Sequence, residues 1–225
     1  MAELIVAFDV ASGREALALA DRLPGLAWAK LGSMLFVREG PFLVKEFTAR
    51  GVRVFLDLKW HDIPSTVAES VAAARSQGVA MATVHCLGGP AMLAAAALEA
   101  GPDLALVGVT LLTSHSPAEA EQILGRGVPD VGVEATRLAR LAMAAGLRGV
   151  VASGRELAVL RESLGSTPWI VVPGIRAPSE ASADQVRTVT PAEAVRGGAT
   201  HLVVGRPITR ATNPRAVYEG ILEAL

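Results

Sequence analysis

The hydrophobic positions of the chain fall into short continuous runs that alternate with longer segments rich in Ala, Leu and Arg. The short runs contain mostly Val, Ile and Leu with little polar alternation, which is typical of parallel strands that are covered on both faces. The pattern predicts strands over residues 4–9, 27–31, 53–58, 80–85, 104–112, 149–152, 169–172 and 201–204.

The longer segments predict helices, and proline or glycine marks several of their boundaries. Pro64 lies in the first turn of one predicted helix, and Gly40-Pro41 interrupts another. The predicted helices cover residues 13–22, 34–50, 64–77, 90–100, 117–124, 133–145, 154–164, 191–196 and 214–224.

This order of elements gives about eight strand-helix units, the count of a (β/α)₈ TIM barrel. The alternative is an open doubly wound sheet, which predicts a glycine-rich phosphate fingerprint after the first strand. Residues 9–13 read Asp-Val-Ala-Ser-Gly and lack the G-x-G-x-x-G pattern. Because no linker or low-complexity tract divides the chain, we expect residues 1–225 to form a single barrel domain of the α/β class.

Composition narrows the class of protein further. Hydrophobic residues make up 51% of the 225 residues and charged residues 19%, enough for one sizeable core. The net charge of -1 argues against a nucleic-acid partner, and no uninterrupted apolar run reaches the roughly 18 residues that a membrane helix needs. The start of the chain lacks the basic region of a signal peptide, and Cys86 is the single cysteine, so we expect a cytoplasmic protein without disulfides.

Polar residues follow most of the predicted strands, at the end where barrel enzymes hold their active sites. A charge at the end of an apolar strand is costly unless it is paired. Each polar residue at these positions is therefore a candidate for binding or catalysis. They are Asp9, Lys30, the segment from Asp57 to Asp62, His85, the segment from Thr113 to His115, Arg176 in the turn 173–176, and Gly205-Arg206.

The densest charges lie around the third predicted strand. Lys is rare in this chain, yet two of its three lysines, Lys30 and Lys59, fall at strand ends. Asp57 and Lys59 are two residues apart and should share one face of a strand, with Lys30 at the same level on the neighbouring strand. Such a cluster can be a structural ion-pair network, or it can hold an anionic substrate beside a proton-donating Lys. The density of the charges favours the second interpretation, and the spacing leaves both open.

Two turns predict a phosphate site. Arg176 follows the seventh predicted strand, and Gly205-Arg206 follows the eighth. The loops after these two strands often hold phosphate in barrels of this class, and Arg can pair with it bidentately. An ordinary glycine turn beside a solvated Arg is the alternative interpretation of each turn taken singly.

Residues 55–67, Phe-Leu-Asp-Leu-Lys-Trp-His-Asp-Ile-Pro-Ser-Thr-Val, closely resemble the signature of the orotidine 5'-phosphate decarboxylases. The resemblance extends along nearly the whole chain, through residues 7–9, 30–32, 112–114, 173–176, 184–187, 190–191 and 203–208. It implies conversion of orotidine 5'-monophosphate to uridine 5'-monophosphate and CO2 in pyrimidine biosynthesis, in a homodimer with shared active sites. It implies no cofactor and no metal.

The resemblance also implies a role for each site residue. Lys59 would donate a proton to C6, and Asp62 and Thr66 would reach the active site of the partner subunit. The implied catalytic tetrad is Lys30, Asp57, Lys59 and Asp62. The implied substrate-binding residues are Asp9, Lys30 and Asp57, Thr66 from the partner, Thr113 or Ser114 for the pyrimidine, Gln185, Gly205 and Arg206 for the phosphate, and Arg176 on a closing loop.

Two other functions compete with this one. Magnesium-dependent sugar-phosphate decarboxylases and hexulose-phosphate synthases share the Asp-x-Lys-x-x-Asp pattern. In those enzymes, the resemblance implies an acidic metal ligand near the end of strand two. This chain has Lys30 there, whose charge would oppose a cation. A non-catalytic nucleotide-binding barrel is the third possibility, and the presence of Lys59 with both of its Asp partners argues against it.

Overall fold

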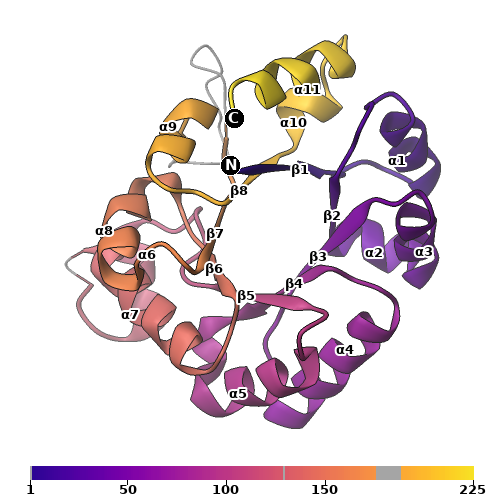
Figure 1. Cartoon of the computed structure of the whole chain (residues 1–225). Helices are drawn as coiled ribbons and strands as arrows, with labels where there is room; N and C mark the ends of the chain where they lie inside the picture. Colours follow the sequence, from indigo (N-terminus) through magenta and orange to yellow (C-terminus); the bar gives the residue numbers. More distant parts are fainter. Residues whose placement is uncertain (1, 129, 176–188) are drawn as a thin grey trace.

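Eight parallel strands, each paired with the next, close into a barrel when β8 pairs with β1 (Figure 1). This computed structural model describes residues 2–128, 130–175 and 189–225. The barrel confirms the fold class predicted from the sequence. Its strands are β1 (Glu3–Ala7), β2 (Trp28–Gly32), β3 (Arg53–Trp60), β4 (Met81–His85), β5 (Ala105–Val109), β6 (Gly149–Val151), β7 (Trp169–Val172) and β8 (His201–Val204).

Helices form a ring around the barrel (Figure 1). Within the described ranges, no helix is long and apolar enough to cross a lipid bilayer. The α-helices are α1 (Gly13–Ala20), α2 (Ser33–Glu39), α3 (Pro41–Ala49), α4 (Pro64–Ser76), α5 (Gly89–Ala100), α6 (Pro117–Leu124), α7 (Val131–Ala144), α8 (Leu157–Leu164), α9 (Pro191–Arg196), α10 (Arg206–Thr209) and α11 (Pro214–Glu223). Two short 3₁₀ helices, η1 (Cys86–Gly88) and η2 (Gly154–Glu156), precede α5 and α8.

The observed elements depart from the sequence prediction in a few places. The predicted helix over 34–50 is two helices, because Gly40 at φ +61° separates α2 from α3. Strand β5 ends at Val109 rather than at 112, and β3 runs on to Trp60 rather than ending at 58. The short helix α10 was not predicted.

The strands bury both of their faces, in two separate apolar layers. On β1, Ile5 and Ala7 point into the barrel, while Leu4 and Val6 pack against the surrounding helices. Side chains alternate in this way because the strand has a period of two residues. Burial on both faces explains why the strands are continuous apolar runs in the sequence.

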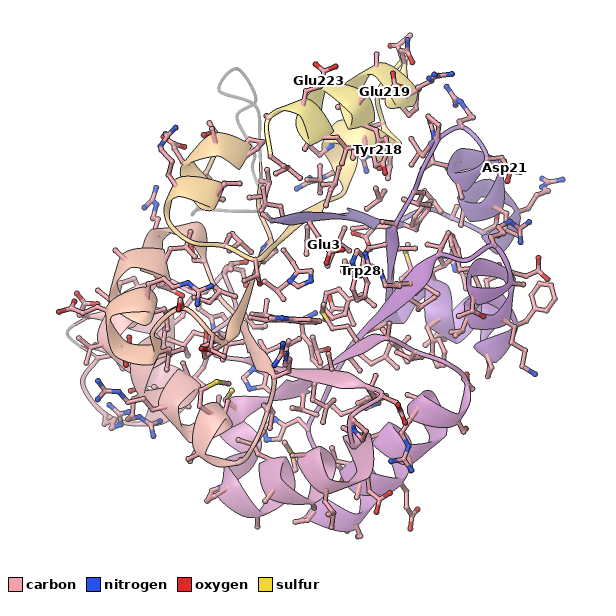
Figure 2. The ribbon with its side chains drawn as sticks, in the orientation of Figure 1. Glu3, Asp21, Trp28, Tyr218, Glu219 and Glu223 are labelled. Carbon is pink, nitrogen blue, oxygen red and sulfur yellow. The ribbon has the colours of Figure 1, made fainter. Side chains whose placement is uncertain are left out.

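The end of the barrel where the strands begin is closed by a polar pair under an indole ring. Glu3 accepts a hydrogen bond from Trp28 Nε1 at 2.7 Å, and the guanidinium of Arg53 pairs with Glu3 and stacks 4.4 Å from the Trp28 ring centre. Figure 2 shows Glu3 and Trp28 inside the ring of strands. Because Glu3 on β1 and Arg53 on β3 pair with each other across Trp28 on β2, this end serves the stability of the barrel.

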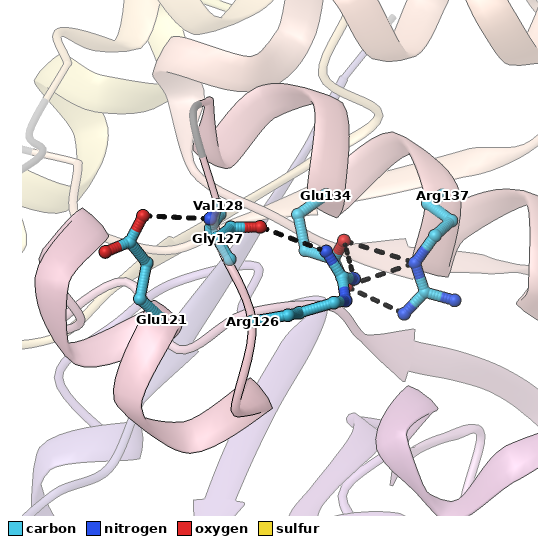
Figure 3. A network of polar contacts seen from close by, with 6 residues as sticks. All are labelled: Glu121, Arg126, Gly127, Val128, Glu134 and Arg137. Carbon is cyan, nitrogen blue, oxygen red and sulfur yellow. Dashed lines mark hydrogen bonds and ion pairs between the residues drawn. The ribbon is translucent and has the colours of Figure 1, made fainter.

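A second polar network ties the loop before α7 to that helix (Figure 3). Glu134 is only 4% exposed and accepts hydrogen bonds from Arg126 Nη2 and from Arg137 Nη2, at 2.5 and 2.7 Å. In the same loop, the Val128 amide donates to Glu121 at 2.9 Å. The bonds from Arg137, ahead of the opposing effect of burial, and those from Arg126 lower the pKa of Glu134.

Replacing Glu134 with Gln should therefore lower the free energy of unfolding by about 1–2 kcal/mol at pH 7, since both arginines are half exposed and part of the loss is screened. The stabilisation by Glu134 is complete above the ordinary carboxyl pKa of 4.5, and is lost as the pH falls through the lower folded value. Urea unfolding of wild type and variant at pH 7 and at acid pH measures the loss of stability and its dependence on pH. Glu162→Gln, at an exposed residue of α8 on the same surface as Glu134, is the control. Equal losses from the two variants would contradict the role of Glu134.

Candidate active site

A cavity of about 290 Å³ opens at the end of the barrel where the strands finish. Its floor is apolar, made by inward-facing residues such as Ala7, Phe55 and Val203, and its walls carry charges. Larger hollows of about 650 and 1110 Å³ lie at the opposite barrel end and beside α7, but their linings contain no lysine. The cavity is lined by Ala7, Asp9, Lys30, Phe55, Asp57, Lys59, Thr113, Val151, Pro173, Gly174, Val203, Gly205 and Arg206.

Four charged side chains form a continuous chain of contacts in this cavity. Lys30 Nζ lies 3.4 Å from Asp9 Oδ1 and 3.3 Å from Asp57 Oδ2. Lys59 Nζ donates to the other oxygen of Asp57, Oδ1, at 2.9 Å. Positive and negative groups therefore alternate from Asp9 through Lys30 and Asp57 to Lys59.

The alternation keeps the two most enclosed members of the network charged. Burial acts to lower the pKa of Lys30, but the carboxylates of Asp57 and Asp9 outweigh it and the pKa is raised. Burial acts to raise the pKa of Asp57, but Lys30 and Lys59 outweigh it and the pKa is lowered. The Lys59 side chain is 39% exposed, against 12% for Lys30, so Lys59 is the more accessible of the two lysines that line the cavity.

The backbone of β3 is irregular where it carries these charges. Leu56 pairs with Ala82 and Trp60 with Val84, so β3 advances four residues where β4 advances two, and the register between the strands shifts. Lys59 has φ +52°, and it is the one residue other than glycine with a positive φ in the described ranges. The assumption of a regular strand from Asp57 to Lys59 was therefore wrong, although the two side chains do meet.

A glycine at the top of β2 leaves room for the pairing of Asp9 with Lys30. A Cβ atom on Gly32 would lie 3.3 Å from Asp9 Oδ1 and 3.4 Å from Lys30 Nζ. The first distance is shorter than most contacts of a Cβ atom, and the second is at the edge of ordinary van der Waals contact. A side chain at this position would therefore crowd the Asp9 carboxylate where it meets Lys30.

The His85 ring, beside the network, adds no positive charge near neutral pH. The His85 ring stacks on the His61 ring at 5.5 Å between centres, and His85 Nδ1 accepts a hydrogen bond from the Leu87 amide at 3.3 Å. Burial, and then the neighbouring His61, His115 and Lys59, lower the pKa of His85 to about 4. In the described part of the chain, no three His, Cys, Asp or Glu side chains are grouped to hold a metal ion.

Asp62 and Thr66 lie outside this cavity. Both are exposed, and Asp62 Oδ1 accepts a hydrogen bond from the Ile63 amide at 2.7 Å. The cap of α4 is Ile63, with no side-chain hydrogen bond, so Asp62 does not take the helix-capping role that is the alternative to a shared site. Within one chain, Asp62 does not complete the predicted tetrad.

The remaining predicted binding residues divide into two groups. Thr113, Gly205 and Arg206 line the cavity, whereas Ser114 is exposed and is not part of its lining. Arg176 and Gln185 lie outside the described residues. A cavity whose lining includes two lysines and an arginine suits an anionic ligand.

Comparison with known proteins identifies the family. Residues 2–221 match the sequence model of the orotidine 5'-phosphate decarboxylase / HUMPS family. The chain belongs to this family. The resemblance expected from residues 55–67 is thereby confirmed.

Relatives in this family align over almost the full chain. The orotidine 5'-phosphate decarboxylase of Alkalilimnicola ehrlichii is 53% identical, over 95% of this chain and 92% of its own. The orotidine 5'-phosphate decarboxylase of Halorhodospira halophila is 49% identical, over 97% of this chain and 93% of its own. A crystal structure of orotidine 5'-phosphate decarboxylase from Lactobacillus acidophilus superposes with a TM-score of 0.88 at 33% identity, covering 100% of this chain and 99% of that one. The predicted enzyme class is confirmed, since relatives named as decarboxylases are carboxy-lyases.

The sequence analysis missed Thr83, which touches both Asp57 and Lys59. Thr83 is wholly buried within β4 and lies between apolar neighbours, Ala82 and Val84. A single polar residue inside an apolar strand needs a hydrogen-bond partner, and that signal could have pointed to it.

Proposed function

We propose that this member of the family is an orotidine 5'-phosphate decarboxylase, which converts orotidine 5'-monophosphate to uridine 5'-monophosphate and CO2. The observation that carries the proposal is the alternating Asp9–Lys30–Asp57–Lys59 network at the mouth of the barrel, with Lys59 Nζ exposed in the cavity. The proposal includes a role in pyrimidine biosynthesis, a cytoplasmic location, and residues 1–225 acting as one catalytic domain.

The chemical difficulty is the charge left behind when CO2 departs. The bond from C6 to the carboxyl carbon breaks, and its electron pair stays on C6 of the pyrimidine. The Lys59 ammonium would stabilise this charge and then donate its proton to C6, which gives the C6–H bond of the product. Asp57 keeps the ammonium in place through its 2.9 Å contact with Lys59 Nζ.

Other residues of the cavity would bind the nucleoside part of the substrate and its phosphate. Asp9 and Lys30 would bind the ribose hydroxyls, and Thr113, which lines the cavity where Ser114 does not, would contact the pyrimidine. Gly205 and Arg206 would bind the phosphate, together with Gln185 and Arg176. The phosphate is remote from the bond that breaks, so its binding energy serves to position the reacting end.

The magnesium-dependent sugar-phosphate chemistry of related barrels fits this cavity less well. The Lys30 ammonium lies within 3.4 Å of both Asp9 and Asp57, where it already neutralises the carboxylates that could bind a cation. A divalent ion beside it would meet a like charge. The geometry of Lys30 thus favours the decarboxylation of a nucleotide.

Lys59→Ala should abolish decarboxylation while binding of uridine 5'-monophosphate persists. The variant loses both the acid and the countercharge of the carbanion, so the rate should fall by more than the roughly 10²–10⁴-fold of acid catalysis alone. Turnover by absorbance and binding by calorimetry measure the two effects. Lys45→Ala, at an exposed residue of α3, is the control and should behave as wild type. Substantial turnover by Lys59→Ala would refute the assignment.

Arg206→Ala should selectively weaken the binding of phosphorylated ligands. A lost charge-assisted contact with phosphate costs about 1.5–3 kcal/mol of binding free energy. Calorimetry should show this loss for uridine 5'-monophosphate and little change for uridine. The neighbouring Arg210, which is exposed and outside the cavity lining, supplies the control variant Arg210→Ala. An equal loss for nucleotide and nucleoside would show that Arg206 does not contact the phosphate.

We further propose a homodimer whose two active sites are each completed by Asp62 and Thr66 of the partner. The exposure of both residues, and the absence of a capping bond from Asp62 to α4, support this arrangement. The residue before a proline favours extended backbone, and Ile63 before Pro64 has φ -58° and ψ 151°. A carboxylate carried outward in this way can reach a second barrel, and a two-fold axis makes the exchange reciprocal.

Mixing the inactive variants Asp62→Ala and Lys59→Ala under subunit exchange should restore activity. The mixed dimer would hold one native site, with Lys59 from one chain and Asp62 from the other. The control mixes Lys59→Ala with Asp57→Asn, whose defects fall on the same side of the site, and no native site can form. If proven exchange restores nothing in the first mixture, Asp62 acts within its own chain.

A further inference from the structure

Thr83 on β4 joins the backbone of Lys59 to the side chain of Asp57. Its Oγ1 accepts a hydrogen bond from the Lys59 amide at 2.8 Å and lies 3.0 Å from Asp57 Oδ1. The residue is fully buried, with an exposed fraction of 0%. It thus lies beneath the charged network and does not line the cavity.

The direction of both hydrogen bonds follows from the chemistry of the partners. A backbone amide can only donate, and an ionised carboxylate can only accept. The Thr83 hydroxyl must therefore accept from the Lys59 amide and donate its one proton to Asp57. The pKa of Asp57 is lowered, so the carboxylate stays ionised and keeps accepting.

The Lys59 amide needs such a partner because the β3 backbone is irregular here. The ladder between β3 and β4 is interrupted from Leu56 to Trp60, and Lys59 is held at φ +52°. A residue with a side chain is strained in this conformation and keeps it only when the surroundings enforce it. The hydroxyl of Thr83 takes the place of a strand carbonyl and fixes the backbone from which the Lys59 side chain starts.

We propose that Thr83 is a positioning residue, which sets the backbone of Lys59 and the carboxylate of Asp57 so that the ammonium points into the cavity. One hydroxyl therefore controls both ends of the Lys59 side chain: the Cα from which it begins and the carboxylate that holds its tip. This role rests on the proposed function, since it acts through the proton donor Lys59.

Thr83→Val tests the role, because valine keeps the shape of threonine and removes the hydroxyl. The expected result is a fall in kcat of about 10- to 100-fold, the size that corresponds to a lost hydrogen bond of about 1.4–2.7 kcal/mol to a charged group. KM and the affinity for uridine 5'-monophosphate should stay within about twofold of wild type, because Thr83 does not touch the ligand. Thr83→Ser, which keeps the hydroxyl, should restore most of kcat.

Thr200→Val is the matched control at the opposite end of the barrel. Thr200 Oγ1 likewise accepts from a backbone amide, Ile170 N at 3.0 Å, and it donates to the Ile170 carbonyl at 3.1 Å. This variant should lose stability in urea and keep its kcat. If Thr83→Val does not fold, Thr83→Ala is measured against the same criteria.

The outcomes separate this proposal from the proposed function. If wild type does not decarboxylate orotidine 5'-monophosphate, the proposed function fails and the role of Thr83 fails with it. If wild type is active and Thr83→Val retains its kcat, only the role of Thr83 is overturned. It is also overturned if Thr83→Ser is as slow as Thr83→Val, or if Thr200→Val loses as much kcat.

Discussion

The carboxylate of Asp57 is the group on which the arrangement of the site depends. It is enclosed at the top of β3, and an enclosed charge is costly unless each of its oxygens has a partner. Lys30 pairs with Oδ2, while Lys59 and Thr83 share Oδ1. Because the partners come from β2, β3 and β4, the carboxylate also fixes how three strand ends lie relative to one another.

The two ends of the barrel use charges differently, although the same strands supply them. At one end Glu3 and Arg53 pair beside Trp28, and each charge is satisfied by its neighbours. At the other end the chain of contacts stops at Lys59, whose ammonium pairs with one carboxylate among the residues that the structure describes and lines a cavity. An ammonium with free donors in a cavity can act on a ligand, whereas paired charges mainly stabilise the fold.

The fold could be predicted from the sequence because it follows from local pattern. Parallel strands that are buried on both faces leave continuous apolar runs, and helices such as α4 carry proline in their first turn. The positions of Lys30, Asp57 and Lys59 at strand ends were enough to bring them together, since parallel strands finish at one face of the barrel. The family followed from residues 55–67, where the sequence motif is long and specific.

The irregular backbone at Lys59 could not be predicted, because it depends on a partner 24 residues away in sequence. The two-residue spacing indicated the right pair of side chains, Asp57 and Lys59, but it assumed a regular strand, whereas β3 is irregular at these residues. The role of Gly32 was missed for a similar reason: the space beside it matters only once Asp9 and Lys30 meet across strands. Whether Asp62 serves its own chain or a partner depends on quaternary structure, which no local pattern contains.

Release of CO2 from orotidine 5'-monophosphate tests the central claim most directly. The full chain is incubated in excess chelator with substrate labelled at the carboxyl carbon, and labelled CO2 and uridine 5'-monophosphate are counted. The network around Asp57 predicts catalytic turnover, with one CO2 for each nucleotide formed and no need for added metal. No release, or turnover confined to a sugar phosphate in the presence of magnesium, would contradict it.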